Sequence, residues 1–134
     1  MVLGHWSLDF SFLLFTVHCL LFTVCCLLFT FMSSRIDIFK QMLVNDPINS
    51  SILFGLAKEY EKAGQTEEMI EALERYLAIS DDEGNAYGML ASAYEKAGRR
   101  EQAKETYQRG IDAATKHGHP SMSEEYRAIL ENDF

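Results

Sequence analysis

The feature that most constrains this chain is a pattern that is written twice, 34 residues apart. The first copy reads Leu-Ala-Lys-Glu-Tyr-Glu-Lys-Ala-Gly and ends at Gly64, and the second reads Leu-Ala-Ser-Ala-Tyr-Glu-Lys-Ala-Gly and ends at Gly98. Apolar residues recur at helical spacing on both sides of each glycine. A period of this length with a helix on either side of a turn is typical of stacked helix pairs. The sequence therefore predicts an all-α chain that forms a short solenoid.

The repeated residues resemble the tetratricopeptide repeat (TPR) family. The first copy supplies the first-helix part of the family pattern, with Leu53, Leu56, Ala57, Tyr60 and Gly64. The second copy supplies both helices, with Tyr87, Leu90, Ala91, Tyr94, Gly98, Ala103 and Tyr107. Departures from the pattern stand at Met69, Leu73, Tyr76, Asp81 and Thr115. Four of these five lie in or just after the second helix of the first copy, so that helix is the weaker match.

The repeat register divides the chain into an apolar N-terminal segment and a TPR domain. The segment covers residues 1–32 and the domain covers residues 33–134. Within the domain we expect a half-repeat helix at 34–49, a first repeat at 50–83, a second repeat at 84–117 and a capping helix at 118–134. We also expect Thr66 to cap the second helix of the first repeat. Ser121 with Glu124 predicts a capping box at the start of the last helix.

The N-terminal segment has two interpretations. Residues 10–34 contain no Asp, Glu, Lys or Arg, and are long enough to cross a bilayer as a helix. Arg35 and Lys40 follow this stretch and no basic residue precedes it, which would place the repeat domain on the cytoplasmic side of a single-pass protein. The absence of a basic residue before the apolar run argues against a secretory signal peptide.

The second interpretation begins from a tandem seven-residue unit in the same stretch. Leu-Leu-Phe-Thr begins at Leu13, Leu20 and Leu27. Crossing lipid does not require identical units, and a helix drifts against a period of seven. Such repetition is more typical of duplicated DNA, and Met32 stands at its end. We then expect translation to start at Met32 and the repeat domain to be cytoplasmic, with no membrane partner.

Charge and cysteine content narrow the classes of partner and site. The chain has 12 Lys and Arg against 20 Asp and Glu, a net charge of −8. An acidic domain repels phosphate backbones, so nucleic acid is not expected as a partner. The repeat domain contains no cysteine, because Cys19, Cys25 and Cys26 all precede it. It therefore has neither a disulfide nor a Cys-based metal site.

Side chains suited to catalysis do not form a recognisable constellation in the repeat domain. It lacks a Gly-rich phosphate loop, and its carboxylates are spread over faces that we expect to be solvated. His117 and His119 stand beside Pro120, which favours a plain turn over a metal site. The acidic runs lack the alternating Asp and Asn of a calcium loop. We therefore expect no enzymatic activity, no cofactor and no metal.

The resemblance implies a protein–protein interaction module that binds a peptide or helix of a partner protein in a concave groove. The groove would be lined by the first helices, at Ser51, Phe54, Lys58, Lys62, Asn85, Gly88, Ser92 and Lys96. Phe54 is the best candidate for an anchor, with Lys58 and Lys62 orienting an acidic peptide. The alternative for Phe54 is ordinary core beneath the helix at Ile36–Leu43. The Lys and Asn clamp that holds chaperone C-termini would need Asn at the positions of Lys58 and Met89, so a chaperone co-factor role is not indicated.

Two further functions stay open. The half-repeat helix at Ile36–Leu43 lacks a first helix, and its free apolar side would suit a self-assembling structural subunit or homo-oligomer. If residues 1–31 are present in the protein, a membrane-anchored assembly factor is the other possibility.

Overall fold

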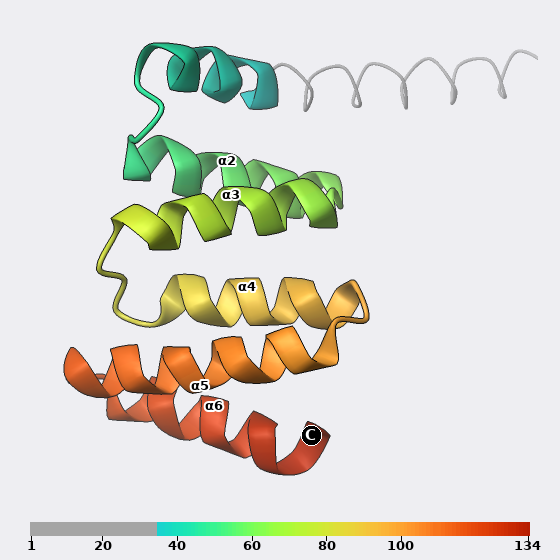
Figure 1. The fold of residues 1–134 in the computed structure, drawn as a ribbon, viewed down its shortest axis with the longest axis vertical. Coiled ribbons are helices and arrows are strands. Elements are labelled where there is room, and N and C mark those ends of the chain that lie inside the picture. The colour runs from blue at the N-terminus through green and yellow to red at the C-terminus, as the bar shows by residue number, and fades with distance from the viewer. Residues whose placement is uncertain (1–34) are drawn as a thin grey trace, which may run out of the picture. The chain divides into compact units, whose positions relative to one another are not determined.

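Short helices alternate with tight turns along residues 35–134, the part of the chain that the computed structural model describes (Figure 1). Residues 35–45 are helical and are followed by α2 (Ser50–Ala63), α3 (Thr66–Ile79), α4 (Asn85–Lys96), α5 (Arg100–Lys116) and α6 (Pro120–Asp133). The described residues contain no strand, which confirms the prediction of an all-α TPR-type solenoid. The segment at residues 1–32, with its possible membrane span and the alternative start at Met32, lies outside them. Within residues 35–134, none of the helices combines the length and the apolar character that a membrane crossing needs.

Local signals set the ends of the helices, although two predicted caps are wrong. The side chain of Asn49 accepts a hydrogen bond from the amide of Ile52 (3.1 Å) and so caps α2. Gly64 ends α2 with a left-handed φ of 70°, as the glycine pattern predicts. Thr66 already lies inside α3, whose cap residue forms no side-chain hydrogen bond. At α6 the helix begins at Pro120, before Ser121, because a proline fits the first helical position without losing a hydrogen bond.

A carboxylate in the connection between the repeats caps α4 in place of the residue at the N-cap position. The cap residue is Gly84, which has no side chain to offer. Asp82 reaches forward instead, and its Oδ1 accepts hydrogen bonds from the amides of Gly84 (2.8 Å) and Ala86 (2.9 Å). These two hydrogen bonds satisfy amide donors at the helix start that would otherwise be unpaired.

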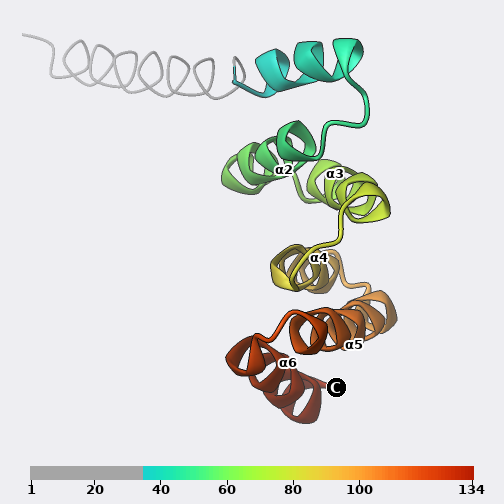
Figure 2. The same ribbon diagram turned by 90° about the vertical axis from the view of Figure 1, so that its left-hand side faces the viewer.

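The helices form two layers, with α2, α4 and α6 on one side and α3 and α5 on the other (Figure 2). Ala57 and Ala91 are completely buried, as expected for small residues that let paired helices approach closely. Leu53 and Leu73 are the largest fully buried side chains, and they belong to the main core cluster. Each first helix thus lies between the second helices of its own and the preceding repeat.

The helix at residues 35–45 packs through one side only. Ile36 and Leu43 are buried in the main core. The ring of Phe39 lies 3.1 Å from where a Cβ would stand on Gly55, so the missing side chain lets this ring approach α2. The opposite side of the helix stays exposed.

Candidate binding groove on the first helices

The residues predicted to line a groove separate into two sets in the structure. The α4 set is brought together around one hollow of about 310 Å³ and consists of Asn85, Gly88, Ser92 and Lys96. The hollow is completed by Glu61, Met69, Met89, Tyr107, Glu125, Tyr126 and Ile129. The α2 set, which consists of Ser51, Phe54, Lys58 and Lys62, does not line it. We call this hollow the α4 groove.

Tyr126 of α6 is the groove residue that sequence reasoning missed. Its hydroxyl donates a hydrogen bond to the carbonyl oxygen of Gly84 (3.0 Å) and is buried. A Cβ on Gly88 would stand 2.7 Å from Cζ of this ring, and a Cβ on Gly110 would stand 3.0 Å from Cε2. The ring therefore occupies the space that two glycines leave open. The only signal in the sequence was a pair of glycines, Gly88 and Gly110, which lie on the two facing helices of one repeat.

The first repeat fills the same place from within. Phe54 stands one repeat before Gly88, and Tyr76 stands one repeat before Gly110. Their ring centroids are 5.2 Å apart in a tilted arrangement. Two aromatic side chains of one repeat are thus replaced, one repeat later, by two glycines and a tyrosine from α6. This exchange explains why the α2 set and the α4 set differ in shape.

Phe54 fits neither of its two predicted environments completely. Its ring is half-buried against Tyr76, and Nζ of Lys58 lies 6.0 Å above it. The contact between the helix at 35–45 and α2 is made by Phe39, whose ring packs against Gly55. Phe54 is therefore partly committed to the fold, and its role as an anchor stays a prediction.

The two lysines of the α2 set have acidic partners on their own helix. Nζ of Lys62 lies 2.8 Å from Glu59, whose side chain is only 7% exposed. Nζ of Lys58 lies 3.2 Å from Glu61. By contrast, Lys96 in the α4 groove forms no ion pair with any of the described residues. A carboxylate on a ligand could therefore pair with Lys96 without competition from an acidic residue within 35–134.

Burial keeps two tyrosine hydroxyls neutral, that of Tyr94 in α4 and that of Tyr107 in the groove wall. Burial raises the pKa of Tyr94 to about 12, and a hydrogen bond to Glu74 acts in the same direction. Burial also raises the pKa of Tyr107 to about 12, with the carboxylate of Glu95 adding to the effect. Both hydroxyls are protonated at neutral pH, so neither can act there as a base.

The two histidines between α5 and α6 lie close to carboxylates in the connection between α3 and α4. Nε2 of His119 lies 3.0 Å from Glu83, and Nε2 of His117 lies 3.4 Å from Asp81. Lys116 also pairs with Asp81 at 2.7 Å, and this pair together with the contact from His117 lowers the pKa of that carboxyl. Across residues 35–134, no three side chains of the metal-binding types converge on one point.

Comparison with known proteins agrees with the stacked helix pairs. The sequence profile of the tetratricopeptide repeat matches residues 62–122. No curated protein matches the chain.

Two of the solved structures that resemble this chain illustrate the shared fold. One is the MamA protein, with 23% identity over 74% of this chain and 62% of that chain and a TM-score of 0.58, so this chain spans less than two thirds of its length. The other is PcrH in complex with the chaperone binding region of PopD, with 15% identity over 97% of this chain and 95% of that chain and a TM-score of 0.67. The repeated pattern and the paired helices thus agree with the profile match, which identifies tetratricopeptide repeats within residues 62–122.

Proposed function

We propose that this chain is a protein–protein interaction module and that a peptide or helix of a partner protein binds in its α4 groove. The observation that carries the proposal is the convergence of Asn85, Gly88, Ser92 and Lys96 on one hollow. Four other helices, α2, α3, α5 and α6, contribute the remaining walls, so the groove exists only in the stacked array. The PcrH structure, which contains the chaperone binding region of PopD, supports a protein segment as the ligand.

The lining of the groove favours a ligand with one apolar side chain beside a polar backbone or carboxylate. Met69 and Met89 supply flexible, polarisable side chains that adapt to different apolar shapes. Asn85 can donate to or accept from a peptide backbone, and Lys96 can pair with a carboxylate. Glu61 and Glu125 at the walls would repel a second acidic group close by. The α2 set would contact the same ligand only where it runs on past α4.

A peptide library displayed on phage tests this proposal, with the full chain as bait. Selected peptides are then measured by fluorescence polarisation against the variant Ser92→Arg. Arginine at this half-buried groove position would occupy the space of the ligand, so we expect affinity to fall at least about tenfold, which corresponds to roughly 1.4 kcal/mol.

Gln102→Arg provides the matched control, because it adds the same side chain at an exposed position of α5 that lies outside the groove. It should leave peptide affinity unchanged. The proposal fails if peptides bind Ser92→Arg as tightly as the unmodified chain, or if selection yields no peptide that competes for the groove. Equal weakening by both variants would indicate a nonspecific effect of added charge and would also count against the groove.

A further inference from the structure

Within residues 35–134, the repeat register leaves the first and the last helix each without the partner helix of its repeat, in complementary ways. The helix at residues 35–45 corresponds to the second helices α3 and α5, and its last residue lies one period before Ile79, the last residue of α3. At the other end, α6 follows α5 as the next first helix (Figure 2). The described part of the chain therefore begins with the second half of a repeat and ends with a first half.

The helix at 35–45 exposes an apolar face that the repeat otherwise covers. Ile38 is 55% exposed and Met42 is 44% exposed. One repeat later, the position of Met42 is held by Tyr76, whose ring packs against Phe54 of the repeat's own first helix. Ile38 and Met42 thus belong to the surface on which a first helix packs.

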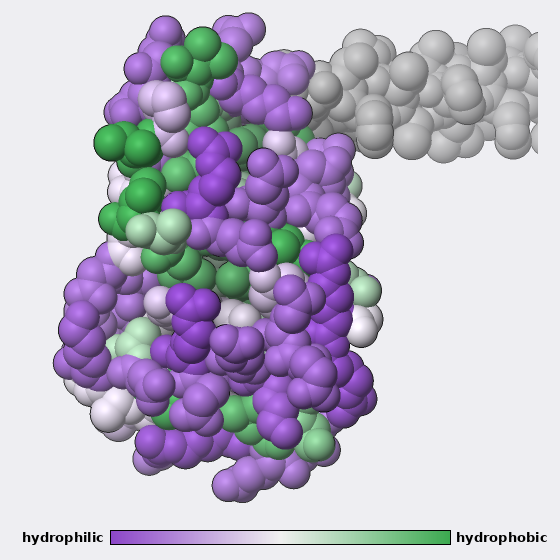
Figure 3. All heavy atoms as spheres, viewed as in Figure 1, coloured by the Kyte–Doolittle hydropathy of each residue, from purple (hydrophilic) through white to green (hydrophobic). Residues whose placement is uncertain are grey.

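Exposed apolar surface gathers at this end of the described structure. Figure 3 shows it over the helix at 35–45, the turn that follows, and the end of α3. The exposed large apolar side chains of residues 35–134 all lie on these elements: Ile38, Met42, Val44, Ile48 and Ile79. Apolar surface of this kind, rimmed by polar residues, marks interaction sites.

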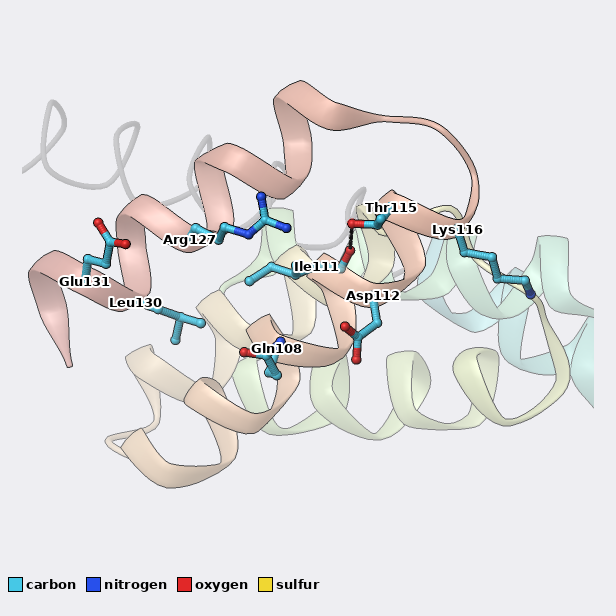
Figure 4. A pocket seen from close by; sticks show the side chains of 8 residues that line it. All are labelled: Gln108, Ile111, Asp112, Thr115, Lys116, Arg127, Leu130 and Glu131. Carbon is cyan, nitrogen blue, oxygen red and sulfur yellow. Dashed lines mark hydrogen bonds between the residues drawn. The ribbon is translucent and has the colours of Figure 1, made fainter.

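The opposite end has a groove of about 630 Å³ between α5 and α6, in which Ile111 and Leu130 point toward one another (Figure 4). Thr115 lies on its α5 wall. One repeat earlier the position of Thr115 is held by Asp81, which is paired with Lys116 of α5, the following second helix. The groove between α5 and α6 is therefore the place where another second helix of the array would pack.

We propose that copies of this chain associate head to tail, with the helix at 35–45 of one copy docked in the groove between α5 and α6 of the next. The docked helix would complete the repeat that α6 begins. The exposed Ile38 and Met42 would then be covered by α6 of the next copy, and the array would continue across the junction with the packing it has inside each chain. A second copy satisfies both unmatched ends at once, because each end supplies the half-repeat that the other lacks.

Charge permits this contact, and its size makes it weak. The groove carries both signs at its rim: Asp112, Lys116, Arg127 and Glu131. The docking helix also presents both signs, at the exposed Asp37 and Lys40. A helix of this length spans only about 16 Å, so the contact is smaller than the roughly 800 Å² per partner of a standard interface. Association should therefore depend on concentration, and because a head-to-tail contact does not close, it should continue beyond the dimer.

Sedimentation velocity of the full chain over a concentration series tests the proposal. Ile38→Glu blocks the docking helix. Its control is Val44→Glu, at an exposed apolar residue of the same helix that lines a different groove, beside α3. Leu130→Glu or Thr115→Arg blocks the receiving groove, and the second of these changes an exposed residue that is not part of the core. Ala128→Glu, exposed on α6 outside the groove, is the control for that end. Each block should weaken association at least about tenfold, and neither control should.

A mixing experiment gives the sharpest readout. Ile38→Glu keeps an open groove and Thr115→Arg keeps an intact docking helix, so each alone should stay monomeric while a mixture forms a dimer that grows no further. The proposal is overturned if the unmodified chain stays monomeric at every concentration, or if the mixture does. It is also overturned if association persists in the blocked variants, since residues outside the two ends would then drive it.

Discussion

Replacing Gly88 by alanine should destabilise the fold even though alanine is the better helix former. In an isolated helix the change would favour the folded state by about 1 kcal/mol. Here the new Cβ would stand 2.7 Å from Cζ of Tyr126 and 3.0 Å from Cε1 of the same ring. Overpacking of this kind costs roughly 1–3 kcal/mol.

The ring can escape the clash only by leaving its site. It would then lose the hydrogen bond to Gly84, which contributes about 1 kcal/mol. We therefore expect Gly88→Ala to lower the free energy of unfolding by about 1–3 kcal/mol after the gain in helix propensity is subtracted. For a domain of this size that is a fall in Tm of several degrees, roughly 4–8 °C per kcal/mol.

The background variant Tyr126→Ala turns this expectation into a test of sign. With the ring removed, nothing opposes the new Cβ of Gly88→Ala from that side, and the change should stabilise by about 1 kcal/mol. Urea unfolding of the four chains, followed by circular dichroism, measures both effects and their coupling. If Gly88→Ala stabilises the unmodified chain, or has the same effect in both backgrounds, Tyr126 does not occupy the groove at Gly88.

Four further predictions follow from the packing and the ion pairs. Ala91→Leu should lower the free energy of unfolding by roughly 1–3 kcal/mol in urea titrations, because the residue is fully buried at the helix contact; no change would mean that the contact is loose. Phe54→Ala should cost about 2 kcal/mol, less than for a fully buried ring, and a melting temperature equal to that of the unmodified chain would return Phe54 to the anchor role. The pKa of Tyr94 and that of Tyr107 are each raised to about 12, so the folded state favours the neutral hydroxyl. The stability that these two groups contribute to the fold is complete below about pH 10 and is lost as the pH rises through 12. Urea midpoints that do not fall across this window would contradict the expectation. The pKa of Asp81 is lowered from its usual 3.8, so its carboxylate stabilises the fold above pH 3.8, and this stability is lost as the pH falls through the folded-state pKa. The melting temperature of Asp81→Asn should therefore fall less in acid than that of the unmodified chain.

Sequence alone determined the helices and their order, because those depend on local spacing. The 34-residue offset and the turn glycines predict helix pairs, and the structure places α2 at Ser50–Ala63, at the start of the repeat predicted at 50–83. The caps at Thr66 and Ser121 were wrong, since several residues near a helix start can serve as its boundary and the turn geometry chooses among them. A proline at the first helical position outweighed a capping box one residue later.

Only the tertiary structure decided which side chain forms the α6 wall of the groove. Tyr126 lies outside the repeat pattern, and its contacts with Gly88 and Gly110 join residues that are far apart in the chain and on three different helices. No local periodicity encodes such a contact, because it depends on how α6 rotates as it packs on α5. The pairing of Lys58 and Lys62 with their own helix was open to sequence reasoning, since residues three apart share a helix face. The filling of the space between two glycines by a ring from α6 was not, because it exists only once the layers have stacked.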